Sequence, residues 1–131
     1  MSTEANVRTI QGIYEAFGRG DVPAILDRLS EGVRWEAHLD PIVPWGGDYS
    51  GKTNVPRFFD AIARSADILS FEPREFVAEG DRVVSLGTFG FRAKATGREM
   101  QTRWIFVWTV KDGVVTSYEQ FHQPGIADAF R

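Results

Sequence analysis

The sequence contains no cysteine, and this absence excludes several kinds of chemistry. Disulfides, iron–sulfur clusters, zinc–thiolate sites and thiol nucleophiles all require a cysteine side chain. Only two histidines are present, and they do not form a His-x-His or His-x-x-x-His pair. The glycine-rich motifs that bind phosphate groups are also missing. We therefore expect neither a bound metal nor a cofactor.

Long apolar runs and concentrations of one charge are missing as well. No stretch approaches the ~20 apolar residues of a membrane span, and residues 1–7 lack the apolar core of a signal peptide. The 15 Lys and Arg and 18 Asp and Glu give a net charge of −3 and are scattered along the chain. No basic stripe is available to follow a phosphate backbone. We therefore expect a cytoplasmic protein that binds neither membrane nor nucleic acid.

The length of the chain limits the number of domains, and its aromatic content indicates a large core or an aromatic pocket. With 131 residues, it is long enough for one ordinary domain and too short for two, so residues 1–131 are expected to form a single domain. Aromatic residues make up 13% of the chain, with ten Phe, four Trp and three Tyr. This content is high for the length, and the rings must fill a core or line a pocket.

The first half of the chain predicts three helices, at about 3–18, 21–29 and 53–62, because apolar residues recur there with a helical period. Each segment starts near a capping residue, and proline falls in the first turn of the second and third. The candidate caps are Ser2 or Thr3, Asp21 and Thr53. The apolar faces carry Val7, Ile10, Tyr14 and Phe17; Ile25, Leu26 and Leu29; and Val55, Phe58, Phe59 and Ile62.

Strand patterns occupy residues 33–38 and most of the second half, where the apolar period changes to two. The later strands are expected at about 69–78, 82–94, 99–110 and 114–122, with turns at Gly80-Asp81, Thr96-Gly97 and Asp112-Gly113. Three successive hairpins make an antiparallel meander, and glycines at 87 and 90 allow its second strand to bend. We predict an α+β fold in which a curved antiparallel sheet wraps around the helices as a hollow cone.

The turn at 111–113 decides which side chains face into that cone. A two-residue turn would pair Lys111 with Val114, whereas a three-residue turn with a bulge at Gly113 would pair Val110 with Val114. We favour the bulge, because a left-handed glycine in third place is what it requires. In that register one face carries Thr102, Trp104, Phe106, Trp108, Tyr118, Gln120 and His122.

The opposite face of the same strand is also apolar. It carries Ile105, Val107 and Thr109, and a sheet that is apolar on both sides must be covered on both sides. The helices cover one side. We therefore expect a homodimer through the outer face of the sheet.

The order and spacing of these pieces resemble the nuclear transport factor 2-like superfamily, particularly its SnoaL-like and ketosteroid-isomerase-like branches. The resemblance covers about residues 5–130. It implies a cone-shaped, cystatin-like α+β barrel that is often dimeric and has an apolar pocket on the concave face. The pieces that carry it are Tyr14-Glu15-Ala16-Phe17, Gly20-Asp21, Val33-Arg34-Trp35-Glu36, Gly51, Arg57-Phe58-Phe59, Ala78 to Val84, Thr96-Gly97-Arg98, Val110 to Gly113 and the stretch from Tyr118 to Phe130.

The catalytic groups of three branches of this superfamily are largely missing here. The tyrosine, base and acid of ketosteroid isomerases would fall on Ile13, Ala37 and near Phe106. For limonene-type epoxide hydrolases Arg82 matches the arginine, but the two aspartates fall on Val84 and Gln120. Where SnoaL-like cyclases have an acidic residue late in the last strand, this chain has Gln120 and His122. If proton transfer survives, histidine has replaced the carboxylate.

The expected catalytic residues are therefore His122, His38 and Asp40, because imidazole titrates near neutral pH and the end of the first strand is where related sites have their base. The expected ligand-binding residues are Tyr14, Trp35, Trp104, Phe106, Tyr118 and Gln120, with Trp45 as a lid. The plainer interpretation makes His122 a hydrogen-bonded strand-end residue, His38 and Asp40 loop residues, and the aromatic residues ordinary core.

Two functions follow from this site. The first is a cofactor-independent isomerase, cyclase or dehydratase that uses histidine acid–base catalysis on a cyclic or apolar carbonyl or hydroxyl compound. The second is a non-catalytic module whose pocket holds a small apolar molecule. The missing carboxylates favour the second, and the two histidines with a polar-tipped pocket favour the first.

Overall fold

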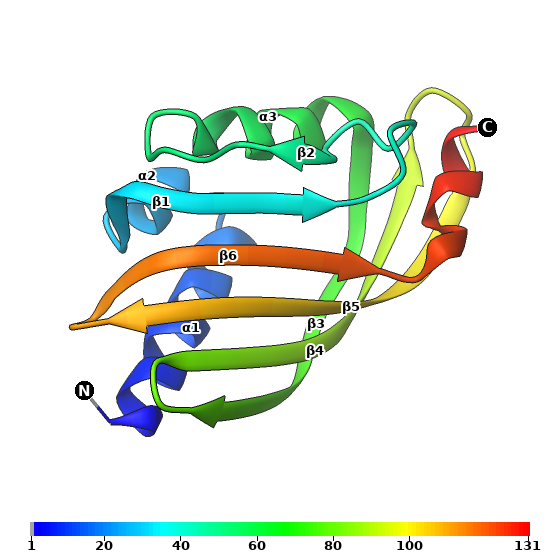
Figure 1. Ribbon diagram of the computed structural model, residues 1–131. Helices are drawn as coiled ribbons and strands as arrows, with labels where there is room; N and C mark the ends of the chain where they lie inside the picture. The colour runs from blue at the N-terminus through cyan, green and yellow to red at the C-terminus, as the bar shows by residue number, and fades with distance from the viewer. Residues whose placement is uncertain (1) are drawn as a thin grey trace.

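The computed structural model describes residues 2–131, which form four helical segments and one sheet (Figure 1). The α-helices precede most of the sheet in the chain, and a 3₁₀ helix ends it. The helices are α1 (Thr3–Gly18), α2 (Val22–Leu26), α3 (Val55–Ser65) and η1 (Pro124–Phe130). The strands are β1 (Leu29–His38), β2 (Gly47–Asp48), β3 (Ala66–Glu79), β4 (Arg82–Ala93), β5 (Glu99–Lys111) and β6 (Val114–His122).

Two of the three expected helix caps are present. The Ser2 side chain accepts a hydrogen bond from the Ala5 N–H at 3.1 Å, and Asp21 accepts one from Ala24 at 3.1 Å. The expected cap at Thr53 is wrong, because α3 begins one residue later, with Asn54 in the cap position. The second helix is also shorter than expected and ends at Leu26, since Leu29 already belongs to β1.

The six strands form one curved, unclosed sheet in the order β2-β1-β6-β5-β4-β3. The strands from β3 to β6 make the predicted antiparallel meander. One feature differs from a purely antiparallel sheet, because β1 lies parallel to β6, with Trp35 beside Tyr118. Parallel neighbours arise here because the chain crosses from one strand to the other through the whole meander. In Figure 1, α1 lies behind the sheet and α3 lies at its upper edge.

The hairpin between β5 and β6 corrects the expected register but keeps the expected faces. Lys111 pairs with Val114, and both Asp112 (φ 51°) and Gly113 (φ 78°) are left-handed, so the turn is the two-residue type I′. The register then shifts between Thr109 and Val110, and from there Trp108 pairs with Tyr118. The two-residue turn alone would put Tyr118 on the opposite face from Trp108. The one-residue shift reverses this and returns Tyr118 to the same face as Trp108. The aromatic row therefore shares its face with Gln120 and His122, as the favoured register predicted.

Gly87 allows the close packing that gives this sheet its inner surface. A Cβ atom at this position would lie 2.3 Å from Cζ2 of Trp104 and 2.4 Å from the carbonyl oxygen of Glu72. Only glycine leaves room for the indole and the neighbouring strand together. In the adjoining strand β3, the register shifts between Pro73 and Glu75. These two features curve the sheet around α1.

None of the helices described within residues 2–131 combines the length and the apolar character needed to cross a membrane.

Candidate active site

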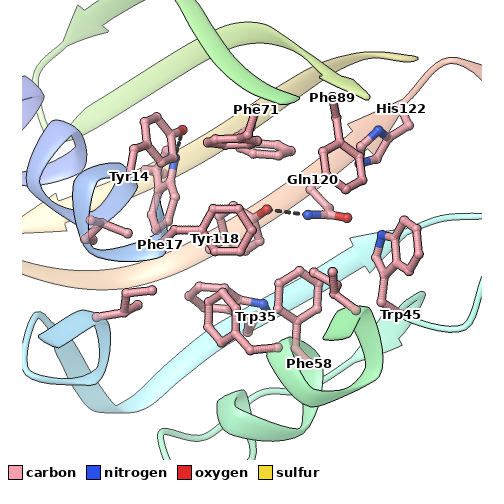
Figure 2. Close-up of a pocket in the computed structure, with 16 residues that line it drawn as sticks. Tyr14, Phe17, Trp35, Trp45, Phe58, Phe71, Phe89, Tyr118, Gln120 and His122 are labelled. Atoms are coloured by element: carbon pink, nitrogen blue, oxygen red, sulfur yellow. Dashed lines mark hydrogen bonds between the residues drawn. The ribbon is translucent and has the colours of Figure 1, made fainter. Parts of the chain in front are cut away.

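A cavity lies between the concave face of the sheet and the helices (Figure 2). The volume of the cavity is about 50 Å³. Its walls are mostly aromatic and aliphatic, which is typical of sites for apolar ligands. The lining residues are Ile13, Tyr14, Phe17, Ile25, Trp35, Trp45, Phe58, Phe59, Ile62, Phe71, Phe89, Phe106, Trp108, Tyr118, Gln120 and His122.

The cavity is narrow, so a ring-sized ligand has to displace part of the wall. Phe17, Phe59 and Phe71 are the wall residues best placed to move, because they are only partly buried. The rings of Phe17 and Phe71 meet edge to face with centroids 5.0 Å apart. By contrast, Trp35 and Trp45 are each 1% exposed and are fixed by packing on all sides.

Tyr14 enters the cavity from α1 and ends in a small buried polar network. Its hydroxyl accepts a hydrogen bond from Trp108 Nε1 at 2.9 Å and is hydrogen-bonded to the Ser85 hydroxyl. Burial raises the pKa of Tyr14, and its hydrogen bonds to Ser85 and Trp108 oppose this rise only in part. Tyr14 is therefore a neutral hydroxyl at the wall. Its partner on β4 is Ser85, a small polar residue that no sequence pattern distinguishes as part of the site.

Tyr118 and Gln120 form the second polar pair, both projecting from the inner face of β6. The Gln120 amide Nε2 donates to the Tyr118 hydroxyl at 2.5 Å. Burial raises the pKa of Tyr118, which keeps this hydroxyl neutral as well. The tyrosine ring lies against Trp35 and Trp108, with centroid distances of 4.2 and 4.4 Å. The amide oxygen of Gln120 is buried without a hydrogen-bond partner among the described residues.

His122 is the titratable imidazole at this cavity. It lies at the end of β6, with Phe89 and Phe106 as its aromatic neighbours at centroid distances of 6.4 and 6.1 Å. Its Nδ1 is buried and has no hydrogen-bond partner within residues 2–131. Burial lowers the pKa of His122 to about 4, so the ring is neutral at neutral pH. A neutral imidazole can accept a proton from a ligand.

The structure does not bring His38 and Asp40 to the cavity, where we expected them. The strand alternates regularly to its end, so Trp35 and Ala37 face inward and His38 faces outward. The His38 Nε2 lies 2.9 Å from a Glu119 carboxylate oxygen on the outer face. Asp40 is exposed in the following loop, where its carboxylate accepts a hydrogen bond from the Ile42 N–H at 3.0 Å.

Two tryptophans differ from their expected places. Trp104 lies within the core, with its ring stacked on Phe106 at 3.8 Å and on Phe71 at 5.2 Å, rather than at the cavity wall. Trp45 does line the cavity, but it is 1% exposed and packs against Phe91 and Phe130. It is therefore a fixed part of the wall rather than a lid.

Several wall residues were visible in the sequence but were interpreted only as helix or strand patterning. Phe58, Phe59 and Ile62 belong to the apolar face of α3, and Phe71 and Phe89 alternate along β3 and β4. The helical period predicts that the first three face inward. It does not indicate whether they face a filled core or a cavity.

A possible cation-binding group within residues 2–131 lies on the outer face of the sheet. The His38 ring and the Glu36 and Glu119 carboxylates each offer a ligand atom, and these atoms lie within 4.8 Å of one another. The His38 ring stacks on Phe121 with centroids 4.8 Å apart. Because this group is on the other side of the sheet from the cavity, an ion bound there would not contact a ligand in the cavity.

The chain is similar to known proteins both in sequence and in structure. The family model described as SnoaL-like domain matches residues 10–118. No curated protein matches the chain by sequence. Among solved structures, an NTF2-like protein from Burkholderia xenovorans LB400 is 31% identical, with a TM-score of 0.90 over 100% of this chain and 99% of that one.

More distant structures have the same fold. A protein from Rhodopseudomonas palustris named as a candidate isomerase is 17% identical, with a TM-score of 0.75 over 94% of this chain and 92% of that one. A protein from Mesorhizobium loti named as a candidate SnoaL-like polyketide cyclase is 15% identical, with a TM-score of 0.72 over 88% of this chain and 97% of that one.

Proposed function

The chain belongs to the family of SnoaL-like domains, and from this premise we propose that it binds a small apolar molecule in its cavity and transfers a proton at His122. The reaction class would be a cofactor-independent isomerisation, cyclisation or dehydration of a cyclic or apolar compound with a carbonyl or hydroxyl group. Two structural relatives, one named as a candidate isomerase and one as a candidate polyketide cyclase, have names consistent with this class.

One observation carries the proposal. A neutral imidazole with an unpartnered, buried Nδ1 stands at an aromatic-walled cavity. Buried polar atoms normally have a hydrogen-bond partner, so an unpartnered one beside a cavity indicates that a ligand provides it. The imidazole can take a proton from a carbon next to a carbonyl group and return it at another position. Such an isomerisation consumes no net proton.

The tyrosines and the glutamine would hold the ligand rather than move protons. Tyr14 and Tyr118 are neutral hydroxyls whose pKa values are raised by burial, so neither can act as a base near neutral pH. The Gln120 amide does not titrate in this range. Among the cavity-lining residues that the structure describes, only His122 can then change its protonation state between pH 4 and 7.

The test is proton exchange on a simple bicyclic ketone. The α-protons of 2-tetralone exchange with D₂O, and proton NMR follows their loss in the presence of the protein. We expect exchange faster than in buffer alone, lost in His122→Gln and retained in His38→Gln, the matched substitution on the outer face. The accelerated rate should stay constant from neutral pH down to about pH 5 and fall near the His122 pKa of about 4. Equal acceleration by wild type and His122→Gln would contradict the proposal.

A second candidate function is ligand binding without chemistry. It is favoured by the absence of any carboxylate or cation from the cavity wall within residues 2–131. Several known reactions on this fold depend on carboxylates, as the resemblance implies. In the exchange experiment this function predicts that 2-tetralone binds, detected as a rise in thermal stability, while its protons exchange at the buffer rate.

We also propose that two copies associate through the outer face of the sheet. Ile105 and Phe121 pair across β5 and β6 on this face and are 44% and 41% exposed. Two neighbouring apolar side chains on an open sheet are typical of a buried interface. A second copy presents the same pair, so a two-fold arrangement would cover both.

A further inference from the structure

Gln120 presents a hydrogen-bond acceptor to the cavity. Its Nε2 is occupied by the Tyr118 hydroxyl at 2.5 Å, and its Oε1 is buried and unpartnered among the described residues. The side chain is 3% exposed, so bulk water does not satisfy this oxygen. In Figure 2 the amide lies across the middle of the cavity, with its nitrogen toward Tyr118 and its oxygen on the side of Trp45 and His122.

The residues around Gln120 fix the amide at one end. Its strand neighbours are Phe106 on β5 and Ala37 on β1. The Tyr118 hydroxyl that accepts from its Nε2 belongs to a ring held between Trp35 and Trp108. The amide is thus anchored at its nitrogen, and its oxygen is left without a partner at the cavity wall.

A ligand can satisfy this oxygen only with a hydrogen-bond donor. A carbonyl oxygen cannot form a hydrogen bond with Oε1, because both atoms are acceptors. A hydrocarbon has no donor either and would leave Oε1 unpaired. A buried acceptor left without a donor is unfavourable, because it has lost its hydrogen bonds to water and gained none in return. A hydroxyl or an N–H group removes that cost.

Trp35 adds the complementary group on the same cavity. Its Nε1 is a donor, is buried and has no partner within residues 2–131. A hydroxyl group both donates and accepts hydrogen bonds. A ligand with a hydroxyl can therefore pair with either unpartnered atom, the acceptor Gln120 Oε1 or the donor Trp35 Nε1. The wall offers no cation for an anionic ligand, since the residues that line it include no Lys or Arg and the His122 ring is neutral at neutral pH.

We infer that Gln120 makes the cavity selective for uncharged ring compounds that carry a hydroxyl donor, over the matching hydrocarbon, ketone and carboxylate. This inference rests on the proposed function, because it assumes that the cavity is the ligand site.

The experiment uses four compounds built on one skeleton: indane, 5-indanol, 1-indanone and indane-5-carboxylate. Their dissociation constants are measured at neutral pH by isothermal titration calorimetry with the whole chain. We expect 5-indanol to bind about tenfold or more tightly than indane, as one buried hydrogen bond predicts. 1-Indanone should bind more weakly than 5-indanol, because its carbonyl can accept from Trp35 Nε1 but cannot donate to Gln120 Oε1. Indane-5-carboxylate should bind most weakly.

The variant Gln120→Met keeps the size of the side chain and removes its acceptor. We expect the preference for 5-indanol over indane to shrink in Gln120→Met to the part that the unpartnered Trp35 Nε1 can provide. Gln101→Met, at an exposed position on β5, is the matched control and should keep the wild-type preference.

The outcomes separate the inference from the function on which it rests. Equal binding of indane and 5-indanol by the wild type, or tightest binding of 1-indanone, would overturn the selectivity and leave the cavity as a ligand site. A preference of undiminished size in Gln120→Met would overturn the role of Gln120 alone. If none of the four compounds binds, the cavity is not a ligand site and both proposals fail.

Discussion

His38 pairs across β1 and β6 with Phe121, the residue that precedes His122, so the two histidines of the chain lie on opposite faces of the sheet. Neighbouring positions on paired strands thus give two imidazoles with different surroundings. His38 is exposed and contacts carboxylates, whereas His122 is largely buried among aromatic rings. This contrast makes each histidine the natural control for the other.

The first prediction concerns stability in acid. The pKa of His122 is lowered from 6.5 to about 4 by burial, so between these values the unfolded chain binds a proton that the folded chain does not. Stability that is present above pH 6.5 is therefore lost as the pH falls toward 4, by at most about 3 kcal/mol. Urea unfolding at pH 7 and pH 4.5 should show a smaller loss for His122→Gln than for wild type. His38→Gln should not reduce the loss in the same way, and an unchanged loss in His122→Gln would contradict the prediction.

A second prediction concerns the buried hydroxyl of Tyr14. Tyr14→Phe leaves Trp108 Nε1 and the Ser85 hydroxyl without their partner in the core. We expect a loss of about 2 kcal/mol in the free energy of unfolding, measured by urea denaturation. The control is Tyr49→Phe, which removes one long hydrogen bond of 3.4 Å from a half-buried residue. Its loss should stay within about 0.5 kcal/mol. Equal losses in the two variants would show that the network contributes nothing of its own.

The third prediction tests the close packing at Gly87. A methyl group in Gly87→Ala would collide with Trp104 and with the backbone of β3, neither of which can move freely. We expect destabilisation of about 3 kcal/mol, seen as a lower urea midpoint. Gly12→Ala, in α1, meets nothing within 4 Å and should instead stabilise the protein by about 1 kcal/mol through its better helix propensity. A neutral Gly87→Ala would mean that the strands can separate at this point.

A fourth prediction addresses the association of two copies. Ile105→Lys places a charge in the middle of the proposed interface, and burying an unpaired charge is strongly unfavourable. Sedimentation velocity should find a dimer for the wild type and a monomer for Ile105→Lys. Ile42→Lys is the control, because Ile42 is 39% exposed but lies in the loop between β1 and β2, outside the face that carries Ile105 and Phe121. A monomeric wild type at micromolar concentration would refute the interface.

Apolar patterning made the fold predictable to a large extent. The period of two after residue 68 predicted the meander, and the row containing Trp108, Tyr118 and Gln120 was placed on the correct face. The register itself was not predictable, because the structure combines a two-residue turn with a separate shift near Thr109. No glycine or proline marks that shift in the sequence. The two-residue turn and the register shift each exchange the faces of the strand, so together they leave the alternation of apolar residues unchanged.

The site was harder to predict, for reasons that particular residues make clear. Simple alternation from Trp35 places His38 on the outer face, but the resemblance to related sites, which have their base at the end of the first strand, led us to expect it at the cavity. Trp104 and Trp108 alternate identically along β5, yet only Trp108 lines the cavity. The difference arises from the curvature near Gly87, which depends on contacts between strands. Sequence pattern determines the face of a sheet, and three-dimensional packing determines which part of that face is hollow.

The parallel alignment of β1 with β6 also determines the order in which the molecule can assemble. The ring of Trp35 meets that of Tyr118, which leaves the ribosome only after 82 intervening residues have been made, counted from the positions of the two rings. Contacts so distant along the chain form slowly, because a long loop must close first. While the chain is being synthesised, the first strand therefore has only the short β2 beside it, and the wall of the cavity is completed only when β6 has been made.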